Sequence, residues 1–479
     1  MNIKSFNKFC NFCDKILNSN KSSVFTHSIT ALHVLKEHPG ILQQYFNIEK
    51  KKYTNKNPIK QKIFSYLLNF FNEKKNFLVN NSSKNSEVLI ISNLINENHL
   101  YSKDDFYFGS LEEYLNKNNI KSYTVLRNLT NQSSSKLINK IKKNKILLTS
   151  KTFFYREIYI LFYIFREYLI IKFNFKIPKI PGLKKNFLSL FSMKSMVYNL
   201  RLYYQIRELI LEKKPKILIL PFEGQAWERI VIKSIKDTKL DTKVVAYQFG
   251  TTTKYQHALF RPLKKDYNPD LIITSGNLLM NKFIKNYKCP VKVFGSNKYR
   301  KKKNQVKKVN KIFLVLPEGF KSETKFMLDF TLNCAKVYPN YQFIFRAHPL
   351  FLEEGSKEII KIKKEINKYK NLNFSNMPLV NDLNYCNYVI FRGTAAVLEA
   401  VSRGLKPIYL KRKNELDFNP LHNVFQKNLV AYETSDIEKI IHYIKKNGVK
   451  SKISKYSNEF FLKPDLKKIK NILLNSDKW

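Results

Sequence analysis

Two short polar motifs in the second half of the chain carry residue types that bind phosphate. One is Arg346-Ala347-His348-Pro349 and the other is Arg392-Gly393-Thr394, and each follows an apolar run typical of a buried strand. Imidazole and guanidinium groups donate hydrogen bonds to phosphate oxygens, and a helix start after Gly393 would add free backbone N–H groups. Ligands of open α/β sheets bind at the carboxyl ends of the strands. The motifs therefore predict a pocket for a phosphorylated ligand, with a nucleotide-sugar favoured.

Each motif also has a purely structural interpretation. His348 could be a turn residue, and Thr394 could simply cap the helix that follows it. The functional interpretation is favoured because both residues would lie at neighbouring strand ends of one sheet. Two further candidates extend the pocket. Glu318-Gly319 ends another apolar run, where glycine lets the backbone approach a phosphate, and Glu399 could either reach ribose hydroxyls or face solvent.

Carboxylates in the first half of the chain could supply a general base. Glu223 and Glu228 follow an apolar run and flank Trp227, one of only two tryptophans. A carboxylate at a strand end facing a cleft could accept the proton of a sugar hydroxyl. The structural alternative is that Trp227 belongs to the core and that Glu228 pairs with Arg229.

A second strand end in the same half carries more polar candidates. Gln248 ends the apolar run 243–248 and Gly250 follows it, so this strand end could contact a substrate. His257 comes shortly after them and is a further candidate base or phosphate ligand.

Cys10, Cys13, His27 and His33 have a spacing that fits a zinc site. The pattern has a second interpretation, because His33 also fits the apolar periodicity of a helix. A structural zinc ion at the N-terminus is therefore one of two hypotheses, and no metal or cofactor is expected to take part in catalysis.

The composition is strongly basic. The 479 residues include 86 Lys and Arg against 37 Asp and Glu, which gives a formal charge of +49. Only 12 of the basic residues are arginines, whereas surfaces dedicated to nucleic acid use arginine for bidentate contacts. We attribute the lysine excess mainly to AT-rich coding, and nucleic acid binding is the less favoured alternative. The charge would still attract anionic lipid.

Location is predicted from cysteine content and hydropathy. Five cysteines in a chain of this length indicate a reducing compartment, and residues 1–15 lack the apolar core of a signal peptide. We therefore expect a cytoplasmic protein. Residues 153–175 are the most hydrophobic segment, but charged residues interrupt it too often for a bilayer span. It is either a core or inter-domain helix, or a helix lying on the inner membrane surface.

Alternating strands and helices predict an α/β protein with two Rossmann-like domains facing a cleft. The predicted order is a mostly helical N-terminal accessory region (1–85), an acceptor-binding domain (86–298) with a helical insertion at about 151–210, a basic linker (299–310), a nucleotide-sugar-binding domain (311–450) and a helical tail (451–479). The expected strands are 88–92, 122–126, 216–221, 243–248, 271–274, 291–294, 312–316, 341–346, 388–392 and 407–410.

From about residue 88 to 475 the chain resembles two-domain glycosyltransferases of the GT-B type, especially bacterial surface-polysaccharide enzymes. The Arg-x-His-Pro motif and Thr394 resemble the paired motifs of CMP-sugar enzymes, such as bacterial sialyltransferases and capsule Kdo transferases, and those of CDP-glycerol glycerophosphotransferases. The resemblance implies that His348 contacts the nucleotide, Thr394 its phosphate and Glu399 the ribose. The segment from Glu223 to Glu228 resembles surface-carbohydrate biosynthesis proteins and would hold the acceptor.

We therefore expect a metal-independent glycosyltransferase of surface or capsule polysaccharide biosynthesis. It would move a sugar from a CMP-sugar, or a UDP-sugar, to a glycan or lipid-linked acceptor. The alternatives are a CDP-glycerol-type phosphotransferase or nucleotide-sugar epimerase on the same fold, a nucleic-acid-binding protein, and a non-catalytic polysaccharide-assembly partner. The candidate residues are Glu223, Glu228 and His257 for catalysis, Trp227, Gln248 and Gly250 for the acceptor, and Glu318, Gly319, Arg346, His348, Pro349, Arg392, Gly393, Thr394 and Glu399 for the nucleotide-sugar.

Overall fold

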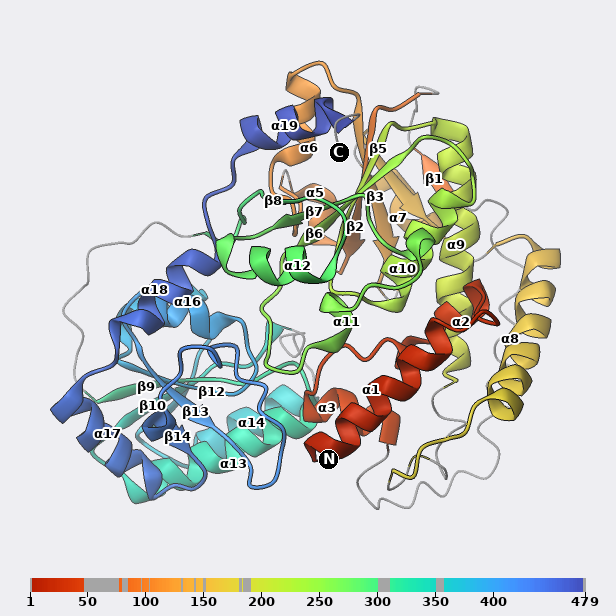
Figure 1. The fold of residues 1–479 in the computed structure, drawn as a ribbon. Helices are drawn as coiled ribbons and strands as arrows, with labels where there is room; N and C mark the ends of the chain where they lie inside the picture. The colour runs from red at the N-terminus through yellow and green to blue at the C-terminus, as the bar shows by residue number, and fades with distance from the viewer. Residues whose placement is uncertain are drawn as a thin grey trace.

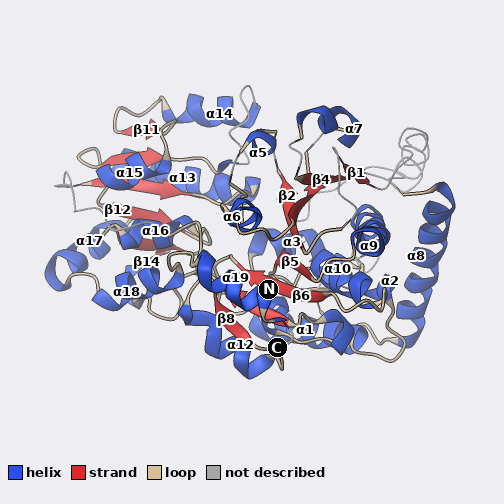
Figure 2. Cartoon of the chain, turned by 90° about the horizontal axis from the view of Figure 1, so that it is seen from above, coloured by secondary structure: helices blue, strands red, loops and turns tan. Residues whose placement is uncertain are grey.

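Two α/β domains lie beside a group of N-terminal helices (Figure 1). The computed structural model describes residues 2–46, 77–79, 85–95, 97–102, 104–130, 132–141, 144–149, 152–180, 183, 191–299, 311–349 and 357–476. Seen from above, the strands gather into two separate sheets with helices around each (Figure 2). This confirms the predicted architecture of two Rossmann-like domains, the arrangement called GT-B.

In the described part of the chain, the first sheet has eight strands in the order β1-β4-β3-β2-β5-β6-β7-β8. All neighbours pair in parallel except β1 and β4. Counted from β2, this is the Rossmann order, which changes direction between β2 and β5. The strands are β1 (Phe77–Val79), β2 (Val88–Leu94), β3 (Ser122–Asn128), β4 (Lys145–Leu148), β5 (Ile217–Pro221), β6 (Lys243–Gln248), β7 (Leu271–Thr274) and β8 (Val291–Val293).

The second sheet repeats this order. Its six strands, within the described residues, run β11-β10-β9-β12-β13-β14 and all pair in parallel. The change of direction falls between β9 and β12. Of the predicted linker between the domains, residues 300–310 lie outside the described residues. The strands are β9 (Ile312–Leu316), β10 (Gln342–Phe345), β11 (Leu372–Phe374), β12 (Tyr388–Phe391), β13 (Lys406–Leu410) and β14 (Val430–Ala431).

Helices surround both sheets, as the apolar strands of parallel sheets require. Among the described residues, none of the helices combines the length and apolar character needed to cross a membrane. The main helices are α6 (Leu111–Lys117), α9 (Met193–Lys213), α10 (Ala226–Lys236), α11 (His257–Phe260) and α12 (Met280–Asn286) in the first domain, and α13 (Lys321–Val337), α14 (Lys357–Ile366), α15 (Leu379–Tyr385), α16 (Ala396–Ser402) and α17 (Asp436–Asn447) in the second.

The N-terminal region forms α1 (Ile3–Leu17), α2 (Val24–His27) and α3 (Pro39–Phe46). The apolar face of α1 shares one hydrophobic core with α8 (Phe154–Asn174) and α9 of the predicted helical insertion. In Figure 1, α1 and α3 lie below α11, and α3 lies next to α13 and α14 of the second domain. The N-terminal helices are therefore packed against the rest of the molecule.

The end of the chain returns to the first domain. Between α18 (Ser451–Phe460) and α19 (Leu466–Leu474), the backbone N–H of Leu462 donates to Ser275 (2.9 Å), and the carbonyl of Leu462 accepts from Ser296 (2.8 Å). Helix α19 then lies beside α6 (Figure 1) and buries Ile469 and Leu473 in a core of the first domain. The predicted helical tail (451–479) is thus divided, because α18 packs on α16 of the second domain and α19 packs on the first domain.

Candidate active site

The carboxyl ends of β9 and β12 mark the point where the second sheet changes direction. Leu316 and Phe391 are paired in these parallel strands, and Glu318 and Gly393 each follow two residues later. The backbone N–H of Gly393 donates a hydrogen bond to Oε1 of Glu318. Crevices at such switch points are the usual ligand sites of open α/β sheets. The structure therefore brings together two of the residues predicted to bind the nucleotide-sugar.

Thr394 and Glu399 lie where the chain enters α16. Oγ1 of Thr394 accepts a hydrogen bond from the N–H of Ala396 (3.3 Å), the first residue of that helix. Thr394 is half-buried beside Gly393, so it lies at the predicted strand end. Glu399 forms an ion pair with Arg403, the C-cap residue of α16 (3.2 Å). This pair favours a local role for Glu399 over contact with a ribose.

The side chains of the Arg-x-His-Pro motif have different surroundings. Nη1 of Arg346 donates to Oδ2 of Asp382 (2.9 Å) and also contacts Ser375 (3.4 Å), so the guanidinium is held toward β11 and α15. Burial lowers the pKa of His348, and the nearby charge of Glu318 opposes that shift. His348 thus offers a neutral imidazole close to Glu318, whereas Pro349 is exposed.

Arg392 is buried, in contrast to its predicted role in binding the nucleotide-sugar. Its side chain is 0% exposed. Nε donates to Glu323 (2.8 Å), Nη2 to Glu415 (2.9 Å) and Nη1 to the carbonyl of Leu410 (2.9 Å). The carboxylates of Glu323 and Glu415 and a backbone carbonyl therefore bind all three nitrogens of the guanidinium. Arg392 holds the loop after β13 to α13, and no part of it is exposed to a ligand.

Glu223 lies at the corresponding edge of the first sheet, two residues after β5. Its side chain is 17% exposed, and its carboxylate accepts a hydrogen bond from Nε2 of Gln225 (2.8 Å). Gly250, after β6, lies so close that a Cβ there would be 2.7 Å from Oε1 of Glu223. Glycine at position 250 thus makes room for the carboxylate. Glu223 remains a candidate base with access to solvent.

Glu228 has a structural role instead of the predicted catalytic one. Its Oε2 accepts three backbone hydrogen bonds, from Glu223 (2.8 Å), Gly224 (2.7 Å) and Gln225 (2.8 Å). Burial and the charge of Glu223 raise the pKa of Glu228 to about 8, while the N–H groups of Glu223 and Gln225 oppose that shift. The side chain is buried beneath the loop that presents Glu223. Its partners are those backbone groups, whereas Arg229 binds Tyr267 and Asn268.

Two of the predicted acceptor residues are interior. Trp227 is buried, with the guanidinium of Arg127 3.6 Å from the ring centroid, as its core interpretation requires. Gln248 is also buried, donating to the carbonyl of Gly250 and accepting from Oγ of Ser275 (3.3 Å). Both side chains shape the loops around Glu223 and neither presents a surface to an acceptor.

His257 is engaged by the N-terminal region. Its Nε2 lies 2.9 Å from both carboxylate oxygens of Asp14 in α1, and Arg261 binds the same carboxylate (2.7 Å). These contacts anchor α1 to α11. They favour a docking role for His257 over the predicted catalytic one.

The predicted zinc ligands do not assemble into a metal site. Among the described residues, no three His, Cys, Asp or Glu side chains are grouped so that they could hold a metal ion. Cys10 and Cys13 are buried in the apolar face of α1, and burial raises the pKa of both thiols. Nε2 of His33 lies 2.9 Å from the backbone oxygen of His27, whose ring stacks on Tyr267. All four side chains are core residues.

Three N-terminal residues that the sequence did not single out lie between the two strand-end edges. Nζ of Lys36 is 3.5 Å from Glu223, Glu37 accepts a hydrogen bond from Thr253 (2.9 Å), and Nε2 of His38 is 3.8 Å from Oε1 of Glu318. One signal could have indicated them, because His38-Pro39 repeats the dipeptide His348-Pro349.

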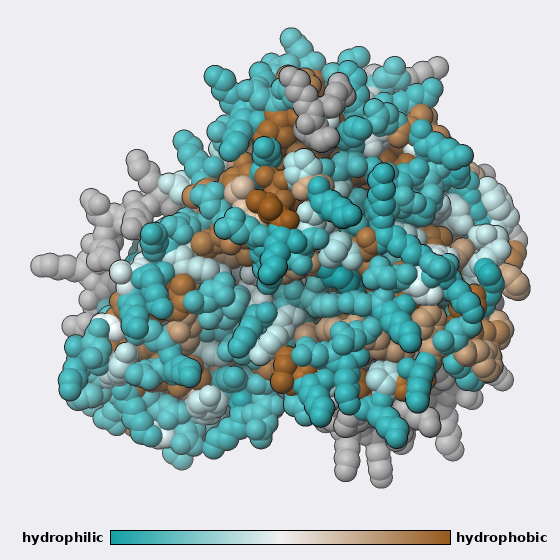
Figure 3. Space-filling view, in the orientation of Figure 1, coloured by the Kyte–Doolittle hydropathy of each residue, from teal (hydrophilic) through white to brown (hydrophobic). Residues whose placement is uncertain are grey.

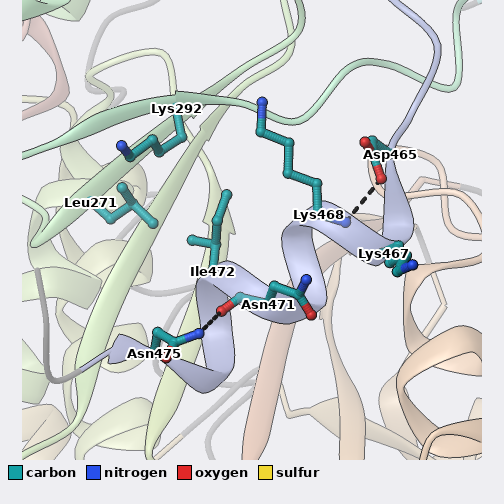
Figure 4. A pocket seen from close by; sticks show the side chains of 8 residues that line it. All are labelled: Leu271, Lys292, Asp465, Lys467, Lys468, Asn471, Ile472 and Asn475. Carbon is teal, nitrogen blue, oxygen red and sulfur yellow. Dashed lines mark hydrogen bonds between the residues drawn. The ribbon is translucent and has the colours of Figure 1, made fainter.

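A separate hollow of about 530 Å³ is lined by residues of α19 and of strands β7 and β8. Figure 4 shows the side chains around it, three of them lysines. It opens beside β7 and β8 of the first sheet, at the end of the chain that packs on that sheet. None of the predicted site residues lines it. Its walls are Leu271, Lys292, Asp465, Lys467, Lys468, Asn471, Ile472 and Asn475.

Comparison with known proteins gives only distant likenesses. No family model and no curated protein matches the chain. Among solved structures, MnaA of S. aureus with UDP has a TM-score of 0.47 and 8% identity, over 82% of this chain and 97% of that chain. UDP-GlcNAc 2-epimerase from Neisseria meningitidis has a TM-score of 0.43 and 13% identity, over 81% and 100%. For trehalose 6-phosphate synthase from Burkholderia multivorans the values are 0.42 and 7%, over 82% and 99%.

Proposed function

We propose that this chain is an enzyme that binds a nucleotide-sugar and transfers the sugar to a glycan or lipid-linked acceptor. The observation that carries the proposal is the hydrogen bond between Gly393 and Glu318 at the switch point of the second sheet. Residues 36–38 link this point to Glu223 of the first sheet, since Lys36 approaches Glu223 and His38 approaches Glu318. Such crevices receive nucleotide ligands in doubly wound sheets. A CMP-sugar is the favoured donor and a UDP-sugar the second choice.

The role proposed for each residue follows from how deeply its side chain is buried and from its hydrogen-bond partners. Glu223 would accept the proton of the acceptor hydroxyl, whose oxygen then forms the bond to the sugar while the bond from the sugar to the phosphate breaks. The nucleotide leaves with that electron pair. His348 and Thr394 would donate hydrogen bonds to its phosphate, while Arg346 and Arg392 keep their ion pairs with buried carboxylates. This chemistry needs no metal ion.

The enzyme would bind its acceptor at an anionic membrane surface, which it contacts through α8. Helix α8 exposes a stripe of large apolar side chains at helical spacing, including Ile158 (52%), Phe162 (63%) and Phe165 (63%). Figure 3 shows hydrophobic residues at the edge of the molecule where Figure 1 places α8. The helix's own acids point inward, since Glu157 binds Arg201 (2.7 Å) and Glu167 contacts Ser23 (3.3 Å). An apolar and basic outer face suits peripheral contact with anionic lipid.

Thermal unfolding with CMP, CDP, UDP and GDP tests the proposal. A ligand that binds only the folded chain raises the melting temperature, so one nucleotide should stabilise the wild type selectively. His348→Ala should weaken that shift, and His442→Ala, at an exposed position of α17, is the matched control. Product analysis with the matching nucleotide-sugar then separates transfer from epimerisation, which would consume the donor without an acceptor. No stabilisation by any of the four nucleotides would refute the proposal.

A further inference from the structure

Residues 36–38 of the N-terminal region connect the two domains at the candidate site. Lys36 approaches Glu223 of the first domain, and Glu37 binds Oγ1 of Thr253 (2.9 Å) and the N–H of Tyr255 (3.2 Å). The next residue, His38, reaches Glu318 of the second domain. This short segment thus forms a third wall of the site, in addition to the two sheet edges.

The ring of His38 is held in a defined orientation. It is buried between Phe320 and Phe418, with ring centroids 4.9 and 4.6 Å away. Its Nδ1 accepts a hydrogen bond from the N–H of Gly40 (3.1 Å). A nitrogen that accepts such a bond carries no proton, so the neutral ring carries its proton on Nε2. That N–H is directed toward Glu318.

The imidazole of His38 and the carboxylate of Glu318 each have a polar atom without a hydrogen bond. Nε2 of His38 and Oε2 of Glu318 are buried, and neither has a hydrogen-bond partner among the described residues. Gly393 lies against both side chains, because a Cβ at this position would be 3.1 Å from Oε1 of Glu318 and 3.2 Å from Cδ2 of His38. Buried polar atoms without partners are rare in folded proteins, and they mark places where a ligand or water completes the hydrogen bonds.

The chemistry of the pair selects a neutral ligand group. Glu318 is ionised, because His38, Arg392 and the N–H of Gly393 lower its pKa against the effect of burial. A carboxylate repels phosphate and accepts hydrogen bonds from hydroxyl groups, while the N–H of His38 donates to a hydroxyl oxygen. An N–H donor beside a carboxylate acceptor is therefore suited to the hydroxyl groups of a sugar.

We infer that His38 and Glu318 together bind hydroxyl groups of the sugar moiety of the nucleotide-sugar, so that the N-terminal segment supplies part of the substrate site. The inference rests on the proposed function. The sugar is favoured over the ribose because the same segment carries Lys36 to Glu223, the candidate base. The ring of His38 thus lies between the nucleotide side and the acceptor side of the site.

Calorimetric titration of two ligand pairs tests this assignment, using UDP with UDP-N-acetylglucosamine and CMP with CMP-N-acetylneuraminate. Affinity for the bare nucleotide should change less than about twofold in His38→Ala and Glu318→Gln. Affinity for the matching nucleotide-sugar should fall roughly 10- to 100-fold, the effect of losing one or two hydrogen bonds. His38→Gln, whose amide N–H can replace Nε2, should retain most of the affinity, and His442→Ala should match the wild type.

The outcomes separate the two proposals. If the wild type binds a nucleotide-sugar and His38→Ala binds it equally well, the assignment of His38 is wrong while the proposed function stands. If His38→Ala loses affinity for the nucleotide and for the nucleotide-sugar equally, the assignment is also wrong, because His38 and Glu318 would then contact the nucleotide. If none of the four nucleotides of the thermal screen stabilises the wild type and it binds none of these four compounds, both proposals fail. Should His38→Ala not fold, the comparison of His38→Gln with Glu318→Gln gives the same readout.

Discussion

Asp14 of α1 and His257 of α11 lie with Nε2 of the imidazole 2.9 Å from both carboxylate oxygens. Arg261 binds the same carboxylate at 2.7 Å. Burial raises the pKa of Asp14, but its hydrogen bond to His257 and the charge of Arg261 outweigh burial, so the pKa falls below 3.8. The first helix of the chain is thereby fixed to the domain that carries the candidate base.

Replacing that carboxylate should loosen the N-terminal helices. Asp14→Asn removes the charge-assisted hydrogen bonds and should cost about 2 kcal/mol in urea unfolding. A lowered pKa means that the ionised Asp14 stabilises the fold above pH 3.8, and that this stabilisation is lost as the pH falls through the pKa of the folded state. The difference in unfolding free energy between Asp14→Asn and wild type should therefore shrink in acid. Asp329→Asn, in an exposed pair with Lys325, is the control. Equal stability of Asp14→Asn and wild type at neutral pH would contradict the docking role.

Glu37 should make stability fall as the pH rises. Burial raises its pKa to about 7, although its bonds to Thr253 and Tyr255 oppose the shift. A raised pKa gives a contribution that is complete below the unfolded value of 4.5 and is lost as the pH rises through about 7. Glu37→Gln stays neutral, so its stability relative to wild type should increase by on the order of 3 kcal/mol across this range. Thermal unfolding in a pH series measures the difference, and parallel curves for the two proteins would rule it out.

Arg392→Met should destabilise the second domain severely. The change leaves Glu323 and Glu415 without their buried partner, which typically costs about 3–5 kcal/mol. Lys325→Met breaks an exposed pair and should cost less than about 1 kcal/mol. Urea unfolding compares the two variants. If Arg392→Met is as stable as wild type but binds the nucleotide more weakly, Arg392 has the ligand-binding role that the sequence predicted.

Two glycines near Glu223 should respond differently to alanine. Gly250→Ala pushes on the carboxylate of Glu223, a movable side chain, so stability should change by less than about 1 kcal/mol. Turnover should nevertheless fall, by about 100-fold if Glu223 is the base. Gly224 has φ +81° and abuts the carbonyl of Ala258, so Gly224→Ala should cost more than about 2 kcal/mol. Normal turnover by Gly250→Ala would argue against Glu223 as the base.

The outer face of α8 should control lipid binding. Phe162→Glu with Phe165→Glu removes two exposed aromatic groups, and vesicle binding should fall more than about tenfold, given the free energy of burying each ring. Co-sedimentation with phosphatidylglycerol and with phosphatidylcholine vesicles measures binding and its charge dependence. Ile360→Glu, at an exposed position of α14, should behave as wild type. Unchanged sedimentation of the double variant would exclude α8 as the contact.

The central strands can be predicted because buried parallel strands are continuous apolar runs. Residues 243–248, 271–274 and 312–316 coincide with β6, β7 and β9. The pattern misses β1, β4, β11 and β14, which lie at or near the sheet edges and have two to four residues each. Runs that short have too few positions to show a period.

The site is only partly predictable for a different reason. A strand end indicates where Glu223, Glu318 and Gly393 lie, because all parallel strands end at one edge. It does not indicate whether the next side chain turns outward or inward, and the partners that bury Arg392 come from distant segments. The dipeptide His38-Pro39 could have indicated one partner, but no local pattern indicates that His38 contacts Glu318, which is 280 residues away.

The return of α19 to the first domain sets an order of assembly during synthesis. The second domain is built from consecutive residues, so its sheet can form once β14 has left the ribosome. The first domain must wait for residues 466–474 to cover Leu271 and Ile273 in its core. A nascent chain that has completed α18 but not α19 therefore carries a folded second domain and an open apolar face on the first, and such an exposed face aggregates unless chaperones cover it.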